Sequence, residues 1–181
     1  MIIIEDSLKI RIQKIKIIAF DVDGVFTDGS LYYDKEGDCL KKFSVLDGVG
    51  IMLLKFLNIK TFIISARFSK ANEARFKEIN LDGVIHGSGN KGEEIKSILK
   101  DQICSKNEIA FVGDDFPDLL AFEQCGLSIA VNNAVPYIKQ KADLVTENIG
   151  GRGAVREVAE LFCTALGVSP CDLFLENYKK S

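Results

Sequence analysis

The chain has 181 residues, of which 47% are hydrophobic and 27% are charged, and its formal net charge is −3. This size suits one globular domain with a substantial core, and the scattered Lys and Arg residues do not indicate a nucleic-acid-binding surface. No apolar run approaches the length of a membrane span, so we expect neither a nucleic-acid nor a membrane partner. We expect a single domain over 1–181, with its core at about 14–166 and a flexible polar tail at 168–181.

The cysteines favour a reducing compartment. There are five, none of them belongs to a C-x-x-C pair, and with His86 as the only histidine they form no zinc constellation. We therefore expect free thiols in a cytoplasmic protein. The apolar start, 1–6, is too short for a signal peptide and carries two acidic residues.

Short apolar runs alternate with segments of helical periodicity along the chain. Helices are expected at 5–13, 46–57, 69–79, 91–100, directly after 118, at 135–141 and at 154–166. Strands are expected at 15–20, 60–64, 83–85, 108–112, 127–131 and 142–145. Two β-prone runs about a glycine turn, at 30–43, indicate a hairpin too small to cover a cleft as a separate domain would. The alternation predicts an α/β fold, a three-layer sandwich around a mainly parallel sheet.

Polar side chains follow several of the expected strands. Ligands of open parallel sheets bind beyond the C-terminal ends of the strands, so these side chains are expected to converge. They are Asp21, Asp23, Ser65, Arg67, Asp114, Asp115 and Asp118, with Lys91 opening a helix after another strand.

These residue types favour phosphoryl transfer. Several carboxylates in one crevice repel each other unless a cation neutralises them, and all-oxygen ligation suits Mg²⁺. One aspartate can attack phosphorus, while a second carboxylic acid protonates the leaving oxygen and later activates water. A lysine and a hydroxyl group can stabilise the charge on the transferring phosphoryl group.

The ordered set of motifs resembles the haloacid dehalogenase superfamily of phosphatases. The set is D-x-D-G-x-x-T-D-G at 21–29, a serine after an apolar strand, Lys91, and G-D-D-x-x-D at 113–118. Over about 14–162 the chain looks more closely like the capless 3-deoxy-D-manno-octulosonate 8-phosphate phosphatase family. Further support comes from D-G-V-G-I at 47–51, R-F-S at 67–69, G-N-K at 89–91 and G-G-R-G-A-V-R-E at 150–157.

The resemblance implies roles for the acidic residues. Asp21 corresponds to the nucleophile and a metal ligand. Asp23 corresponds to the general acid/base, with its backbone carbonyl also on the magnesium ion. Asp114 corresponds to the direct metal carboxylate, and Asp115 and Asp118 to residues that hold metal-bound water.

The resemblance also implies how substrate is bound. Ser65 corresponds to the phosphate-binding hydroxyl, and Lys91 to the lysine that steadies both the nucleophile and the phosphoryl group. Asn90 is expected to contact phosphate or substrate. Arg67 corresponds to the arginine that favours the octulosonate, and a related nonulosonate 9-phosphate phosphatase group tends to carry Glu there. Family members form tetramers in which the hairpin packs on neighbouring subunits, so we expect a homotetramer.

The chain departs from the family pattern at two positions. Ala66 stands where the family usually has Gly, which puts fine substrate specificity in doubt, and Ser65 replaces the commoner Thr.

Some of these residues also have possible structural roles. Asp114 and Asp115 could simply cap the following helix, and Arg67 could form a structural salt bridge. The alternatives to an octulosonate phosphatase are a nonulosonate 9-phosphate phosphatase and a noncatalytic module of the same fold.

Overall fold

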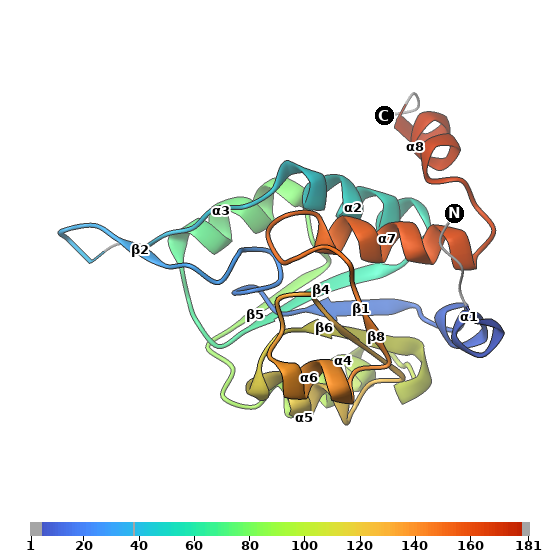
Figure 1. The fold of residues 1–181 in the computed structure, drawn as a ribbon, viewed down its shortest axis with the longest axis horizontal. Coiled ribbons are helices and arrows are strands. Elements are labelled where there is room, and N and C mark those ends of the chain that lie inside the picture. Colours follow the sequence, from blue (N-terminus) through green and yellow to red (C-terminus); the bar gives the residue numbers. More distant parts are fainter. Residues whose placement is uncertain (1–4, 38, 179–181) are drawn as a thin grey trace.

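A six-stranded parallel sheet forms the centre of the protein (Figure 1). The computed structural model describes residues 5–37 and 39–178, and its strands lie in the order β5-β4-β1-β6-β7-β8. The strands are β1 Ile17–Phe20, β4 Lys60–Ser65, β5 Gly83–His86, β6 Ile109–Gly113, β7 Leu127–Ala130 and β8 Leu144–Val145. Each overlaps a strand predicted from the sequence, so the mainly parallel sheet is confirmed.

Helices cover both faces of the sheet and make the predicted three layers (Figure 1). One face is covered by α2 Val45–Phe56, α3 Lys70–Ile79 and α7 Ala154–Ala165. The other is covered by α4 Lys91–Asp101, α5 Leu119–Phe122 and α6 Pro136–Lys141. The chain begins with α1 Asp6–Ile12, and the 3₁₀ helices η1 Lys106–Glu108 and η2 Phe116–Asp118 flank β6.

The central strand β1 is buried on both faces, which explains its unbroken apolar sequence. Ile18 and Phe20 pack into the core that contains α2 and α7, whereas Ile17 and Ala19 pack into the second core, which contains α4. Alternate residues of a strand point to opposite faces, so one short strand anchors both helical layers.

The register of the sheet brings the polar strand ends to one edge. Phe20, the last residue of β1, pairs with Ile63 of β4 and Val112 of β6. The backbone N–H of Asp21 continues the ladder and donates to the Val112 carbonyl at 2.9 Å. The acidic segment after β1 therefore lies between the ends of β4 and β6.

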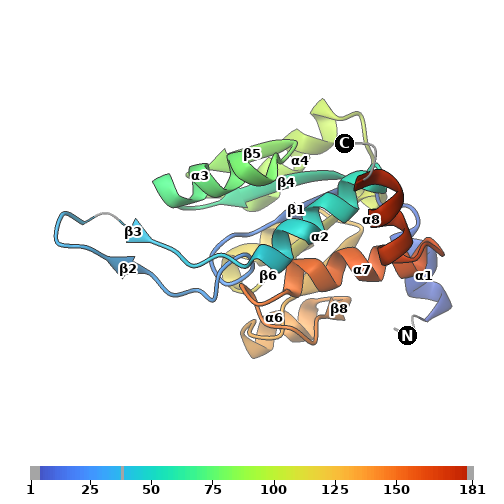
Figure 2. The same cartoon turned by 90° about the horizontal axis from the view of Figure 1, so that it is seen from above.

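A small hairpin projects from this edge, as the sequence predicts (Figure 2). It consists of β2 Tyr32–Tyr33 and β3 Cys39–Leu40, which pair in antiparallel fashion. Tyr32, Tyr33 and Leu40 are exposed on it. A two-residue ladder is too short to be stable by itself, so the hairpin depends on contacts at its base.

The described part of the tail is helical, a feature that the sequence analysis did not predict, while its flexibility stays a prediction. Residues after 168 form α8 Pro170–Tyr178, which begins where the Ser169 hydroxyl accepts a hydrogen bond from the Asp172 backbone N–H at 3.3 Å. Leu173 and Phe174 pack against the main core. These contacts compensate for the polar composition on which the prediction relied, and the end of the tail, 179–181, lies outside the described residues.

The helices of the described ranges were compared with the length and hydropathy that a membrane span requires. No single helix there is both long and apolar enough to cross a membrane, and the pair α7 and α8, bent by 98° at its break, passes on length and composition alone.

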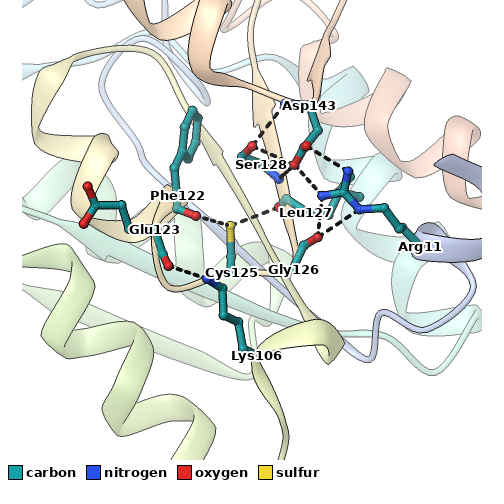
Figure 3. Close-up of polar contacts among 9 residues, drawn as sticks. All are labelled: Arg11, Lys106, Phe122, Glu123, Cys125, Gly126, Leu127, Ser128 and Asp143. Atoms are coloured by element: carbon teal, nitrogen blue, oxygen red, sulfur yellow. Dashed lines mark hydrogen bonds and ion pairs between the residues drawn. The ribbon is translucent and has the colours of Figure 1, made fainter. Parts of the chain in front are cut away.

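A partly exposed network of hydrogen bonds ties α1 to the residues that precede β7 and β8 (Figure 3). The Arg11 guanidinium donates to both carboxylate oxygens of Asp143, at 2.8 and 2.6 Å, and to the Gly126 carbonyl. Asp143 also accepts hydrogen bonds from the backbone and the hydroxyl of Ser128, at 2.9 and 2.8 Å. Burial opposes the charged form of Asp143, but the bonds from Arg11 and Ser128 outweigh it and lower its pKa.

We expect Asp143→Asn to lower the free energy of unfolding by about 1–2 kcal/mol, because it breaks a bidentate, charge-assisted pair. A lowered pKa means that the contribution is present above the pKa of the unfolded chain, near 4, and is lost as pH falls below it. Urea unfolding at pH 7 and at pH 3 measures both effects. A variant equally destabilised at the two pH values would contradict the role of the charge.

Candidate active site

The loop after β1 is held in a tight turn against Asp114. Gly24 has φ +95°, and a Cβ there would collide with the Asp114 carboxylate, so only glycine fits this close approach. The fully buried Thr27 hydroxyl oxygen accepts hydrogen bonds from the backbone N–H groups of Gly24 at 3.3 Å and Gly29 at 3.2 Å. These contacts explain why the G-x-x-T-D-G half of the motif has glycine and threonine at these positions.

Asn133 fixes the same loop from the other side, and sequence reasoning missed it. Its Nδ2 donates to the Gly24 carbonyl at 3.0 Å, and its Oδ1 accepts from the Gly150 backbone N–H at 2.6 Å. A Cβ at Gly150 would collide with the Gly24 carbonyl, so the G-G-R-G segment packs directly against the loop after β1. Only the tertiary arrangement shows this link, because the three residues are far apart in sequence.

Three carboxylates and one ammonium group form the centre of the site. Carboxylate oxygens of Asp21, Asp114 and Asp118 all lie within 4.8 Å of one another. Lys91 Nζ lies 2.8 Å from Asp21 Oδ1 and 2.5 Å from Asp118 Oδ1, and its side chain is only 4% exposed. The structure therefore brings together Asp21, Asp114, Asp118 and Lys91, as the strand-end argument predicts.

Asp118 holds the segment after β6 in place. Its Oδ2 accepts the backbone N–H groups of Asp114 at 2.7 Å and Asp115 at 3.2 Å, while its Oδ1 binds Lys91. Asp115 is exposed, and its Oδ1 caps η2 by accepting from the Phe116 N–H at 2.8 Å. The capping interpretation thus holds for Asp115, whereas a hold on metal-bound water by Asp115 and Asp118 stays a prediction.

The electrostatics of the cluster follow from its burial. Desolvation and the neighbouring Asp118 charge raise the pKa of Asp21 to about 6, against the opposing effect of Lys91. Desolvation together with Asp21 and Asp118 raises the pKa of Asp114 to about 8. For Lys91, burial favours the neutral amine, but Asp21 and Asp118 outweigh burial and raise its pKa. The lysine is therefore charged at neutral pH and is outnumbered by the acids around it.

The residues present fit a divalent cation. Asp114 Oδ1 is buried and accepts no hydrogen bond from the described residues. Three carboxylates and one ammonium group carry a net charge of −2 when ionised, which one Mg²⁺ would neutralise. An all-oxygen donor set without His or Cys suits Mg²⁺.

We expect Mg²⁺ binding to be proton-linked, with the affinity rising between pH 6 and pH 8. The raised pKa values mean that the metal-free site holds protons in this range, chiefly on Asp114, and the metal must displace them. Displacement of one proton makes the dissociation constant fall by up to ~10-fold per pH unit. Calorimetry at pH 7 in two buffers of different ionisation enthalpy should show about one proton released per metal bound. Affinity independent of pH, without proton release, would contradict the assigned ligands.

Asp23 lies two residues after Asp21, in the loop whose Gly24 approaches Asp114, and it has a partner that sequence reasoning missed. Lys41, directly after β3, places Nζ 2.6 Å from Asp23 Oδ1. The Lys41 side chain is 1% exposed and that of Asp23 is 24% exposed. The only signal for this pair in the sequence is a lysine at the base of the predicted hairpin. Such a lysine does not by itself indicate a contact with Asp23, 18 residues away.

β4 ends with Ser65 at the predicted edge, and Ser65 and Arg67 form a local turn there. The Ser65 hydroxyl donates to the Arg67 carbonyl at 3.1 Å and accepts from the Arg67 N–H at 3.2 Å. The Arg67 side chain is exposed and lines a cavity of about 620 Å³ between the hairpin and the loop at 67–71, with Lys41 on the opposite wall. The structure thus places Arg67 where it can contact a ligand, while phosphate binding by Ser65 stays a prediction.

Asn90 has a structural partner that explains its position. Its Oδ1 accepts the backbone N–H groups of Gly92 at 3.0 Å and Glu93 at 3.3 Å, which caps α4. The cap fixes the helix start that carries Lys91, against the unfavourable placement of a cation there. An N-x-x-E pattern is a sequence signal for this cap. Contact between Asn90 and substrate stays a prediction.

The sequence matches known families and relatives over most of its length. Residues 54–157 match the haloacid dehalogenase-like hydrolase family. The chain is 36% identical over 171 residues to the 3-deoxy-D-manno-octulosonate 8-phosphate phosphatase of Haemophilus influenzae, covering 94% of this chain and 95% of that protein. It is 38% identical over 157 residues to the enzyme of the same name from Escherichia coli K12, covering 87% and 84%.

The fold also matches solved structures. That of 3-deoxy-D-manno-octulosonate 8-phosphate phosphatase from Moraxella catarrhalis, in complex with a magnesium ion, a phosphate ion and the sugar acid, has a TM-score of 0.89 and 34% identity. The match covers 97% of this chain and 99% of that one. With the strand-end acids and lysine in place, the chain belongs to the haloacid dehalogenase-like hydrolases, in the family of the 3-deoxy-D-manno-octulosonate 8-phosphate phosphatases.

Proposed function

We propose that this protein is a Mg²⁺-dependent phosphomonoesterase that hydrolyses 3-deoxy-D-manno-octulosonate 8-phosphate to the free sugar acid and phosphate. The observation that carries the proposal is the largely buried cluster of Asp21, Asp114, Asp118 and Lys91, with Asp23 two residues after Asp21 in the same loop. Relatives named for this reaction, which match nearly the whole chain, supply the substrate. The reaction is a step in lipopolysaccharide sugar synthesis.

In the first half-reaction a carboxylate oxygen of Asp21 attacks phosphorus. The bond between phosphorus and the sugar oxygen breaks, and Asp23 gives its proton to that oxygen. Lys91, 2.8 Å from Asp21, stabilises negative charge at the reacting centre. Mg²⁺, held by Asp21, Asp114 and the Asp23 carbonyl, would neutralise charge on the phosphoryl oxygens.

In the second half-reaction the aspartyl-phosphate is cleared. Asp23, now ionised, takes a proton from water as the water oxygen attacks phosphorus. The bond between phosphorus and the Asp21 oxygen breaks, which releases inorganic phosphate and restores the Asp21 carboxylate. Asp23 is protonated again, ready for the next substrate.

The specificity of the site is proposed to reside in the cavity beside the hairpin. It is walled by the hairpin and by the Arg67 loop, and the exposed Arg67 guanidinium can bind the carboxylate of an anionic sugar acid. The test compares kcat/KM for the octulosonate 8-phosphate, a nonulosonate 9-phosphate and simple sugar phosphates. A clear preference for the octulosonate supports the proposal. A stronger preference for the nonulosonate would overturn the role given to Arg67.

We further propose a cytoplasmic homotetramer. The compartment is supported by the five cysteines, which are all free thiols. The assembly is supported by the projecting hairpin, whose exposed Tyr32, Tyr33 and Leu40 are more apolar than a free flap requires. Light scattering of the purified protein tests the assembly, and a monomer at micromolar concentration would contradict it.

A further inference from the structure

Lys41 is the feature of the site that the proposed mechanism leaves without a role. Its side chain is 1% exposed although it stands on a projecting hairpin, and its Nζ lies 2.6 Å from Asp23 Oδ1. Lysine is rarely this buried unless it is paired, because burial of an ammonium group is costly. The pair joins the base of the hairpin to the loop after β1.

The two oxygens of the Asp23 carboxyl group have different surroundings. Oδ1 accepts the hydrogen bond from Lys41, and among the described residues no hydrogen bond occupies Oδ2. The side chain is 24% exposed, so the second oxygen is open to a ligand. The turn made by Gly24 and Thr27 fixes the backbone here, but Lys41 is the one side-chain anchor of Asp23 in the described part of the chain.

We propose that Lys41 is a positioning residue that fixes the rotamer of Asp23, so that Oδ2 faces the oxygen of the leaving sugar. This rests on the proposed function, in which Asp23 delivers a proton to that oxygen. A general acid must lie within hydrogen-bond distance of its target, and a misplacement of about 1 Å costs on the order of 10²-fold in rate. The hairpin thereby contributes to the chemistry of its own subunit.

A purely structural role for Lys41, as a latch for the hairpin, makes a different prediction. An alkyl phosphate expels a poor leaving group that needs the proton, whereas p-nitrophenolate leaves without one. Loss of acid positioning therefore slows the sugar phosphate selectively. Loss of hairpin packing also disturbs the cavity beside the hairpin, so its effect on the sugar phosphate persists when Asp23 is replaced, whereas an effect of lost positioning does not. The parameter to compare is kcat/KM, because it covers the steps up to release of the alcohol or phenolate and excludes clearance of the aspartyl-phosphate.

The experiment measures kcat/KM of Lys41→Met with the octulosonate 8-phosphate and with p-nitrophenyl phosphate. We expect a fall of about 10²-fold for the sugar phosphate and a fall at least ~10-fold smaller for the aryl phosphate. Lys41→Arg should recover most of the loss, because the guanidinium group can donate to the same oxygen. Lys42→Met, on the exposed neighbour, is the matched control and should change neither value.

Coupling to Asp23 separates the outcomes further. In an Asp23→Asn background, Lys41→Met should cause no additional loss with the sugar phosphate, since the group that it positions is gone. Equal losses with both substrates, or additive losses in the double variant, would overturn the proposal. If wild type hydrolyses other alkyl phosphates but not the octulosonate 8-phosphate, the proposed substrate fails, and the same comparison with those alkyl phosphates still decides the role of Lys41.

Discussion

Asp21→Asn is expected to lower kcat by on the order of 10⁴-fold or more while leaving the fold intact. The amide is nearly isosteric with the carboxylate but is a poor nucleophile, so no aspartyl-phosphate forms. Loss of a negative charge next to Asp114 and Asp118 should leave metal-free stability equal to wild type or higher, because desolvation and Asp118 already raise the pKa of Asp21 to about 6.

Steady-state kinetics and thermal unfolding measure the two effects together. Asp101→Asn is the matched control, since that residue is exposed at the end of α4, far along the helix from Lys91. Rapid quenching of wild type with radiolabelled substrate should trap a base-labile acyl phosphate that is missing in Asp21→Asn. Retained turnover in the variant would rule out the covalent mechanism.

Lys91→Met is expected to damage both catalysis and stability. The ammonium group binds Asp21 at 2.8 Å and Asp118 at 2.5 Å, and Asp118 is fully buried. Removing one partner of a buried ion pair leaves uncompensated charge, which costs ~3–5 kcal/mol. Loss of a cation aimed at the transferring phosphoryl group should lower kcat by roughly 10²–10³-fold.

Added Mg²⁺ should restore part of the stability of Lys91→Met, because the metal supplies positive charge to the same carboxylates. Urea unfolding with and without Mg²⁺ measures this. Lys96→Met is the matched control on the same helix, since within the described ranges Lys96 pairs only with the exposed Glu93, and its replacement should change stability by less than ~1 kcal/mol. The role given to Lys91 would be contradicted if both lysine variants behaved alike.

The parts of the fold that could be predicted are those whose signals are local. The unbroken apolar run of β1 ends at Asp21, and β4 and β6 end similarly at Ser65 and just before Asp114. Parallel pairing then brings those ends to one edge without further information. Helix α8 was missed because its stability depends on packing of Leu173 and Phe174 against the core, which composition does not indicate.

The same distinction applies to the active site. Asp21, Asp114, Asp118 and Lys91 were predictable because strand ends and motif order place them together. The contacts of Lys41 and Asn133 were not, since each joins segments that meet only in the folded chain. These two residues do not bear on which reaction is proposed, but they determine how the loop that carries Asp23 is held.

The most direct measurement of the central claim is phosphate release from 3-deoxy-D-manno-octulosonate 8-phosphate by the purified protein, with Mg²⁺ and after chelation. We predict sustained release that needs Mg²⁺, stops with chelator and returns when the metal is restored. Release that persists without the metal, or no release by a folded protein with Mg²⁺ bound, would contradict the account.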